Sequence, residues 1–548
     1  MGIKYSMRIM LIIVAVSAFA VMVNSGSGNE PSVLTLLPPF IAIVAAFTLR
    51  NAIISLFISV WFGAWMVQGG AMADIFFGLI DVPRKYAINT IVDRDHAFIL
   101  LMTAFIGGMM TLLSSSGALG GVVNYFVRWA KTRKRAQLST AFMGLVIFFD
   151  DLTNSMVTGN MMRPLTDRLR VSREKLAYIV DSTSSPVTSI AVISLWVSYQ
   201  IGLIEAATAS LPIAASSFTL LLNSIMYSFY PILTIIFVFM VVLTGRDYGP
   251  MLAAERRALQ SRSETLDVPM LIKEESTKPG SQIFNAILPM LVLMASVVIG
   301  ILSTGEGESL REIVGSADSF LALLVGSFLG SLVAIAVTVL SKVETLDSAL
   351  QSWLAGVSSI IPTMAILVLS WSLGQITVEL QAAAYLTAVV DGAIPIAVFP
   401  AIVFILAALI SLGTGSAWGT MAILMPLVVP LCWGLLNNTA EGLQPEGMHI
   451  FYSSISAVLA GAVWGDHCSP ISDTTILSSM SSQCNHAEHV RTQIPYALTT
   501  GAAAVILGTL PAGFGMPWWS GLMLGASILL VFLVWFGEKT ETLLVEQK

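Results

Sequence analysis

Charge and cysteine are the two features that this 548-residue chain has little of. Only 11% of its residues are Asp, Glu, Lys or Arg, against about 25% in soluble proteins. Hydrophobic residues make up 56% of the chain, and its mean hydropathy is +0.83. Many nearly charge-free windows reach about 20 residues, which is enough for a helix to cross a bilayer. The alternation of every second residue that marks barrel strands is missing. The composition therefore predicts an all-α polytopic membrane protein.

The three cysteines and five histidines show no pattern typical of a disulfide framework or a metal centre. Cys432, Cys468 and Cys484 form no CxxC pair. His486 and His489 lie close together but have no cysteine or carboxylate partner at zinc spacing. The phosphate-binding pattern GxxxxGK followed by Ser or Thr is also missing, which argues against ATP-driven transport by this chain. We therefore predict no resident metal or other cofactor. Because the basic runs are interpreted as orientation signals, we predict no nucleic-acid partner.

Lys and Arg set the expected topology, because cytoplasmic loops hold the excess of these residues. Lys4 and Arg8 place the N-terminus in the cytoplasm, and Lys539 places the C-terminus there. A single long hydrophilic stretch divides the chain into two halves. We predict an N-terminal span or signal anchor over 1–31, a first half over 32–245, a cytoplasmic linker over 246–282, a second half over 283–538 and a cytoplasmic tail over 539–548.

Two apolar segments are predicted to enter and leave the membrane on the same side. Residues 137–162 lie between two clusters of Lys and Arg, so both ends are expected in the cytoplasm. Residues 394–436 have no basic residue at either flank, so both ends are expected outside. Each segment is interpreted as a re-entrant hairpin, with its turn at Asp150–Ser155 or Ser411–Ser416. Non-helical backbone at membrane depth is tolerated only where it lines protein or water.

Each predicted hairpin is followed by a helix that is expected to break at a Ser-Pro pair, at Ser185 in the first half and Ser469 in the second. The segment Asp151–Leu165 also aligns without gaps with Gly413–Leu427. Because one hairpin opens inward and the other outward, the two halves are predicted to be inverted-topology repeats, each with a re-entrant hairpin and a broken transmembrane helix. Interrupted segments at matching positions point to a binding site near the membrane midplane.

Small polar and acidic side chains gather at these turns and breaks. Polar residues at membrane depth are costly, so they are candidates for function. Their oxygen atoms suit a hard cation such as Na⁺, and no Lys or Arg lies near either turn to bind a substrate anion. The candidate ion-binding residues are Asp150, Asp151, Thr153, Asn154, Ser155, Asp181, Ser182, Thr414, Ser416, Asp466, His467, Ser469 and Asp473.

A carboxylate at membrane depth can hold either H⁺ or Na⁺ but not both, and this competition is the simplest physical basis for exchange. His467 follows Asp466 directly and is a candidate proton carrier. Structural roles compete with these interpretations. Asp150 and Asp151 are adjacent and cannot both face one site, so one of them is expected to cap the turn. Asp181 can instead cap a half-helix. His467 in such a position is more often a hydrogen-bonded core histidine than a proton carrier.

The same residues resemble the NhaC-type Na⁺/H⁺ antiporter family of the ion transporter superfamily. The resemblance rests on Phe148–Asp151 with Asn154, Met162–Asp167, Ser172–Tyr178, Asp181–Thr183, Gly413–Thr420 and Gly465–Thr475. It implies a Na⁺/H⁺ exchanger of the inner membrane built from inverted repeats with two hairpins. It also implies a homodimer in which a transport part moves against a static scaffold, with membrane lipid and the transported ions as the other partners.

Two other classes of function stay open. The family includes exchangers of organic acids, and related proteins carry amino acids, so Na⁺- or H⁺-coupled transport of a small organic acid or amino acid is the alternative prediction. An intramembrane aspartyl protease would need Asp150 or Asp151 beside Asp466, sharing a proton. The predicted repeat instead places these acids on opposed units around ions, so we expect no enzyme.

Overall fold

Nearly all of the described chain is helical in this computed structural model. The structure describes residues 32–540, apart from positions 50, 120–128, 193, 214, 261–282, 308–312, 314–315, 391–393 and 438–446. The predicted N-terminal span or signal anchor, most of the predicted tail and much of the predicted linker therefore lie outside the described residues. The longer helices of the first half are α2 (Leu37–Leu49), α3 (Ala52–Val67), α6 (Arg94–Ser115), α8 (Arg133–Val146), α9 (Asp151–Arg168), α10 (Arg173–Ser182), α12 (Leu195–Thr208) and α14 (Phe229–Thr244).

Shorter helices connect these elements, and the second half is built from both long and short helices. In the first half they are α4 (Ile75–Asp81), α5 (Ile88–Val92), α11 (Ser185–Ile190) and α13 (Ser217–Ile225). The second half holds α16 (Ile283–Thr304), α18 (Ser319–Leu340), α19 (Leu346–Ser359), α20 (Ile361–Glu379), α21 (Ala382–Val390), α22 (Phe399–Thr414), α23 (Ala417–Asn437), α24 (Met448–Cys468), α25 (Asp473–Ser481), α26 (His486–Ala503), α27 (Leu510–Gly513) and α28 (Trp518–Phe536).

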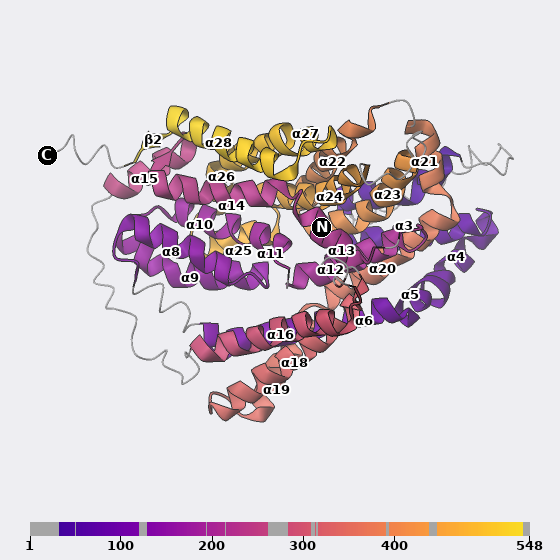
Figure 1. Cartoon of the computed structure of the whole chain (residues 1–548), viewed down its shortest axis with the longest axis horizontal. Helices are drawn as coiled ribbons and strands as arrows, with labels where there is room; N and C mark the ends of the chain where they lie inside the picture. Colours follow the sequence, from indigo (N-terminus) through magenta and orange to yellow (C-terminus); the bar gives the residue numbers. More distant parts are fainter. Residues whose placement is uncertain are drawn as a thin grey trace.

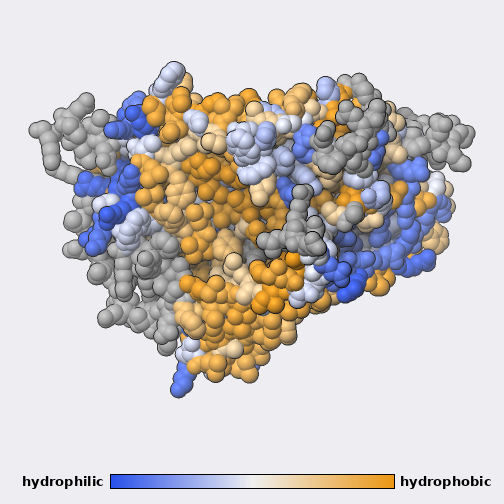
Figure 2. Space-filling view, in the orientation of Figure 1, coloured by the Kyte–Doolittle hydropathy of each residue, from blue (hydrophilic) through white to orange (hydrophobic). Residues whose placement is uncertain are grey.

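The lengths and compositions of these helices confirm an all-α polytopic membrane protein. Among the described residues, nine helices are long and apolar enough to cross a membrane, or eleven if each bent pair is one span. The bent pairs are α10–α11 with α12, at 46°, and α13 with α14, at 42°. Figure 2 shows the apolar surface across the middle of this face and hydrophilic side chains towards its two ends.

The first predicted hairpin corresponds to the helices α8 and α9, which pack against each other (Figure 1). The turn between them covers residues 147–150, so it precedes the predicted turn at Asp150–Ser155 by a few residues. The prediction is corrected here because Asp150 caps α9 and the helix already begins at Asp151.

The carboxylate of Glu255 contacts the start of α8 and the residues just after α9. This carboxylate pairs with Arg133 at the start of α8. It also accepts a hydrogen bond from the backbone N–H of Ser172, just after α9, over 2.7 Å. The chain therefore enters α8 and leaves α9 at the same end of the molecule.

Glu255 belongs to a helix inside the predicted linker. This helix, α15 (Gly249–Gln260), buries Met251, Leu252 and Ala254. The strand β1 (Arg246–Asp247) precedes it and pairs antiparallel with β2 (Glu538–Lys539) near the end of the chain. The described part of the linker is therefore a packed element that joins the two halves.

The second predicted hairpin corresponds to α22 and α23. The turn at Gly415 has a positive φ of 69°, a backbone conformation that glycine adopts without strain. Ser416 then accepts a hydrogen bond from the N–H of Gly419 over 3.1 Å and caps α23. Asp150 caps α9 in the same way. The gap-free alignment of Asp151–Leu165 with Gly413–Leu427 does not place these two capping residues opposite each other. They align only if one half is shifted by about one helical turn.

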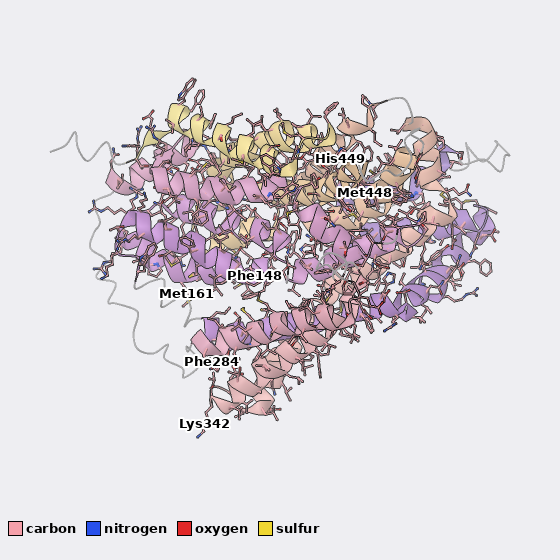
Figure 3. The ribbon with its side chains drawn as sticks, viewed as in Figure 1. Phe148, Met161, Phe284, Lys342, Met448 and His449 are labelled. Atoms are coloured by element: carbon pink, nitrogen blue, oxygen red, sulfur yellow. The ribbon has the colours of Figure 1, made fainter. Side chains whose placement is uncertain are left out.

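Helices α16, α18 and α19 form a limb with α6 along one edge of the molecule (Figure 1). The helices approach closely through glycine: a Cβ added at Gly330 of α18 would lie 2.9 Å from the Cβ of Leu293 in α16. Lys342 lies at the outer tip of this limb, and Phe148 lies at the turn between α8 and α9 in the main body (Figure 3).

Candidate functional site

The turn before α9 shows which of the two adjacent aspartates is structural. Asp150 accepts a hydrogen bond from the backbone N–H of Thr153 over 2.8 Å, and the Thr153 hydroxyl donates to the same oxygen over 2.5 Å. This is an N-cap that satisfies a free donor at the helix start. Asp150 and Thr153, both predicted ion ligands, therefore bind each other.

Asp151 is the aspartate that points into the protein interior. Its side chain is 3% exposed and accepts a hydrogen bond from the Ser185 hydroxyl over 3.2 Å. Helix α25, which follows Asp466 in the chain, contacts α9, the helix that begins at Asp151. Asp466 is 5% exposed, in the last turn of α24, and accepts a hydrogen bond from the Thr474 hydroxyl over 2.9 Å. Each half thus contributes one buried carboxylate, and α25 links the elements that carry them.

Hydroxyl groups continue this arrangement between α9 and α25. The Ser478 hydroxyl donates to that of Ser155 over 3.3 Å. A Cβ added at Gly159 would lie 2.0 Å from the Ser481 hydroxyl oxygen, so the two helices touch through glycine. We call the group Asp151, Ser155, Ser185, Asp466, Thr474 and Ser478 the Asp151–Asp466 site. Its oxygen atoms come from the first helix pair and from the broken helices of both halves.

Asn154 holds the backbone around this site. Its side-chain amide lies 2.8 Å from the carbonyl of Gly144, 2.9 Å from that of Ile147 and 2.9 Å from that of Thr183. The end of α8 and the break after α10 are therefore joined by one side chain. Its remaining oxygen accepts a hydrogen bond from Thr158. Asn154 is thus a structural brace in this conformation rather than a free ligand.

A second buried cluster surrounds Asp181, at the end of α10. One oxygen of Asp181 accepts hydrogen bonds from Thr475 at 3.2 Å and Gln493 at 2.6 Å, and His489 Nε2 lies 3.3 Å from it. Nearby, His467 contacts the Ser182 hydroxyl at 3.1 Å and the Tyr230 hydroxyl at 2.5 Å. We call these residues the Asp181 cluster: Asp181, Ser182, Tyr230, His467, Thr475, His489 and Gln493.

The Asp181 cluster includes residues that the sequence did not suggest. Both ring nitrogens of His467 have partners, which favours the core-histidine interpretation over a proton carrier. His489 and Gln493 were not among the candidates. Their signal is their spacing: two polar residues four positions apart lie on one face of α26. Nothing in the sequence shows that this face meets Asp181.

Comparison with known proteins identifies the family. The chain matches the Na⁺/H⁺ antiporter family over residues 187–512. It belongs to that family. An uncharacterized protein of Haemophilus influenzae is 33% identical over 517 residues, covering 92% of this chain and 95% of the relative. The resemblance noted from the sequence is confirmed, and the chain is a multi-pass transporter of this family.

Two solved transporters share the antiporter-family fold. The YdaH transporter of Alcanivorax borkumensis aligns with a TM-score of 0.55 at 14% identity, over 82% of this chain and 90% of that one. MtrF of Neisseria gonorrhoeae, described as one of a class of antimetabolite efflux pumps, aligns with a TM-score of 0.51 at 12% identity, over 80% and 84%. At these identities the likeness shows the fold alone.

The side chains at the second turn of this antiporter-family chain, Thr414 and Ser416, belong to neither the Asp151–Asp466 site nor the Asp181 cluster. Thr414 and Ser416 line a cavity of about 30 Å³ together with Asn51, Ala46, Ala52 and Gly419. That volume holds about one water molecule. The Ser469 hydroxyl donates to the Leu412 carbonyl over 2.9 Å and ties the turn to the break after α24. Asp473 is exposed in the first turn of α25.

Two tryptophans connect the two turns. Trp196 at the start of α12 and Trp418 at the start of α23 have ring centroids 5.1 Å apart. The Tyr199 hydroxyl also donates to the Trp418 carbonyl over 2.6 Å. The backbone N–H of Leu195 donates to the Phe149 carbonyl of the first turn over 3.0 Å. The start of α12 therefore contacts the turns of both halves.

Proposed function

We propose that this protein is a secondary active transporter of the inner (plasma) membrane that exchanges Na⁺ for H⁺ at Asp151 and Asp466. The observation that carries the proposal is the pair of buried carboxylates, one from each half. Among the described residues, no Lys or Arg forms an ion pair with either of them. Buried carboxylate charges without a basic partner are costly, and a bound cation or proton neutralises them.

The surrounding hydroxyls support a cation as the cargo. Ser185 reaches Asp151, Thr474 reaches Asp466, and both hydroxyls can turn an oxygen lone pair towards a cation. Hard alkali cations prefer such oxygen ligands. When protons replace the cation, the carboxyl groups become neutral and the hydroxyls can accept hydrogen bonds from them. Exchange follows because the two occupants need the same oxygens.

The proposed transport cycle uses the two helix pairs as opposed hairpins. We propose that α8–α9 opens to the cytoplasm and α22–α23 to the outside, with both termini in the cytoplasm. The contact of Glu255 with both outer ends of α8–α9 supports the first part of this topology. Relatives in the ion transporter superfamily work as dimers, and we expect this protein to work as a homodimer as well.

Coupled transport of a small organic acid or amino acid is the second candidate. The fold supports it, because a structural neighbour is described as an antimetabolite efflux pump. The candidate site offers little support, because a substrate carboxylate would need a positive counter-charge and the Asp151–Asp466 site contains none.

Proteoliposomes with an imposed pH gradient test the proposal. A pH-sensitive dye inside the vesicles should report dissipation of the gradient when Na⁺ or Li⁺ is added, but not when choline is added. Asp151→Asn vesicles serve as the matched control and should lose the response. Wild-type vesicles that hold the gradient at every pH in the presence of Na⁺ would refute the exchange. A response that requires an added organic acid or amino acid would instead support the second candidate.

A further inference from the structure

The carboxylate of Asp181 is bonded on one oxygen only. Thr475, His489 and Gln493 all converge on Oδ2, whereas Oδ1 is buried and has no hydrogen-bond partner. The side chain is 1% exposed, so bulk water does not reach it. A buried carboxylate oxygen without a partner is costly, and native structures normally satisfy such atoms.

Gln493 carries a second acceptor without a partner. Its amide nitrogen donates to Asp181 Oδ2 and to the His467 carbonyl, each over 2.6 Å. Both partners are acceptors, so the nitrogen must face them and the assignment of the amide cannot be reversed. The amide oxygen is therefore the atom left over, and it is buried without a partner in a side chain that is 1% exposed.

His489 adds a third such atom. Its Nε2 faces the Asp181 carboxylate and carries the proton of that contact. The other ring nitrogen, Nδ1, is buried without a partner, and in a neutral ring it is an acceptor. Because the two ring nitrogens point in different directions, Nδ1 faces away from Asp181. The two acceptor oxygens beside this contact that lack a donor or a cation are Asp181 Oδ1 and Gln493 Oε1. A small cation is the kind of group that would satisfy these buried acceptor atoms.

We propose that the Asp181 cluster is a second cation site, which binds one Na⁺-sized monovalent cation through Asp181 Oδ1 and Gln493 Oε1. One carboxylate charge matches one monovalent cation, and the oxygen atoms suit an alkali ion. Within the described part of the chain, no group of three His, Cys, Asp or Glu side chains could hold a metal ion of the transition series.

The second site lies next to the first but is separate from it. Thr474 binds the carboxylate of Asp466, and the following residue, Thr475, binds that of Asp181. The first turn of α25 therefore contacts both acids. A cation at Asp181 would fix this turn and, through Thr474, the ligands of the Asp151–Asp466 site. The inference extends the proposed exchange to two cation sites per protein.

Counting bound ²²Na⁺ on the purified full-length protein tests this inference. We expect two Na⁺ per wild-type chain, one per Gln493→Met chain and one per Asp466→Asn chain. Asn285→Leu removes a buried amide from α16, which packs on α18 in the limb, and should leave two. A wild-type count of one that is unchanged in Gln493→Met would overturn the proposal and assign only water to the cluster.

Folding of the variants is checked by their elution as a single species in size-exclusion chromatography. If Gln493→Met aggregates, Asp181→Asn replaces it and is also expected to bind one Na⁺. A wild-type count of one that Asp181→Asn also leaves unchanged overturns the second site. Failure of the proposed exchange has a different signature: vesicles would show no Na⁺-dependent proton flux while the purified protein still binds two Na⁺.

Discussion

The side-chain amide of Asn154 donates a hydrogen bond to the backbone carbonyl of Thr183 over 2.9 Å. This contact joins the start of α9 to the break after α10, two pieces of the chain that were singled out separately as polar interruptions. The same amide group also faces the carbonyls of Gly144 and Ile147. The turn and the break are therefore one structural unit.

Asn154→Ala should destabilise the protein. The substitution leaves buried carbonyl oxygens without a donor, which costs about 1–3 kcal/mol. Asn160→Ala, on the same helix but exposed, is the matched control and should unfold at the wild-type temperature. Thermal unfolding of the purified variants, followed by intrinsic fluorescence, measures the difference. Equal melting temperatures for the two variants would contradict the bracing role of Asn154.

Gly159→Ala should separate α9 from α25. The added Cβ would lie 2.0 Å from the Ser481 hydroxyl oxygen, and overpacking of this kind costs about 1–3 kcal/mol. Because the contact lies beside Ser155 and Ser478, we also expect weaker Na⁺-dependent flux.

Gly374→Ala is the control for this substitution. The nearest atom to the added Cβ is 3.8 Å away, so the variant should be as stable as the wild type or more stable by about 0.4–1 kcal/mol. If thermal unfolding and flux assays do not distinguish the two alanine variants, the close approach of α9 and α25 is not important.

Glu255→Gln should loosen both outer ends of the α8–α9 pair. The substitution removes the charge that pairs with Arg133, which is 11% exposed. Removing one partner of a buried ion pair costs about 3–5 kcal/mol. Glu538→Gln is the control because it breaks an ion pair with Arg256 at the surface, where the Arg256 side chain is 33% exposed and that of Glu538 is 63% exposed. Exposed ion pairs contribute only about 0–1 kcal/mol. Protease cleavage near residue 133 should therefore speed up in the first variant only.

Asp466→Asn and Asp473→Asn should differ although both acids were candidates from the sequence. Asp466 is buried and bonded to Thr474, whereas Asp473 is exposed. Loss of a charge-assisted ligand costs about 1.5–3 kcal/mol, so we expect the apparent Na⁺ affinity to fall by about tenfold or more in Asp466→Asn. Asp473→Asn should stay within about threefold of the wild type because its charge is screened by water. Initial rates at increasing Na⁺ concentration give both values.

Cys484 should react slowly with alkylating reagents. Burial raises the pKa of its thiol to about 12, and the carboxylates of Glu174 and Glu488 act in the same direction. Since the thiolate is the reactive form, the alkylation rate should rise about tenfold per pH unit between pH 7 and 10. Glu488→Gln should speed the reaction. Cys432 and Cys468 are 0% and 4% exposed and should stay unmodified in the folded protein. A rate independent of pH would contradict this account.

The sequence was sufficient for the class of fold, the family and the position of the polar interruptions. Long apolar stretches and scarce charge require helices in a membrane, because only helices and closed barrels satisfy their backbone there. Asp151 and Asp466 belong to a larger set of candidates because a carboxylate at membrane depth is costly and is therefore a candidate for function. The domain boundaries and the opposed orientation of the two hairpins stay predictions from the same basic-residue pattern.

The tertiary structure alone decided which of these residues act together. Asp150 and Asp151 are equivalent in a sequence, and the cap geometry at Thr153 separates them. Asp181 and Gln493 lie 312 residues apart, yet their side chains are in contact. The periodicity of a helix shows which residues share a face, but it does not show which face of another helix that face will meet. That choice depends on packing across the whole molecule.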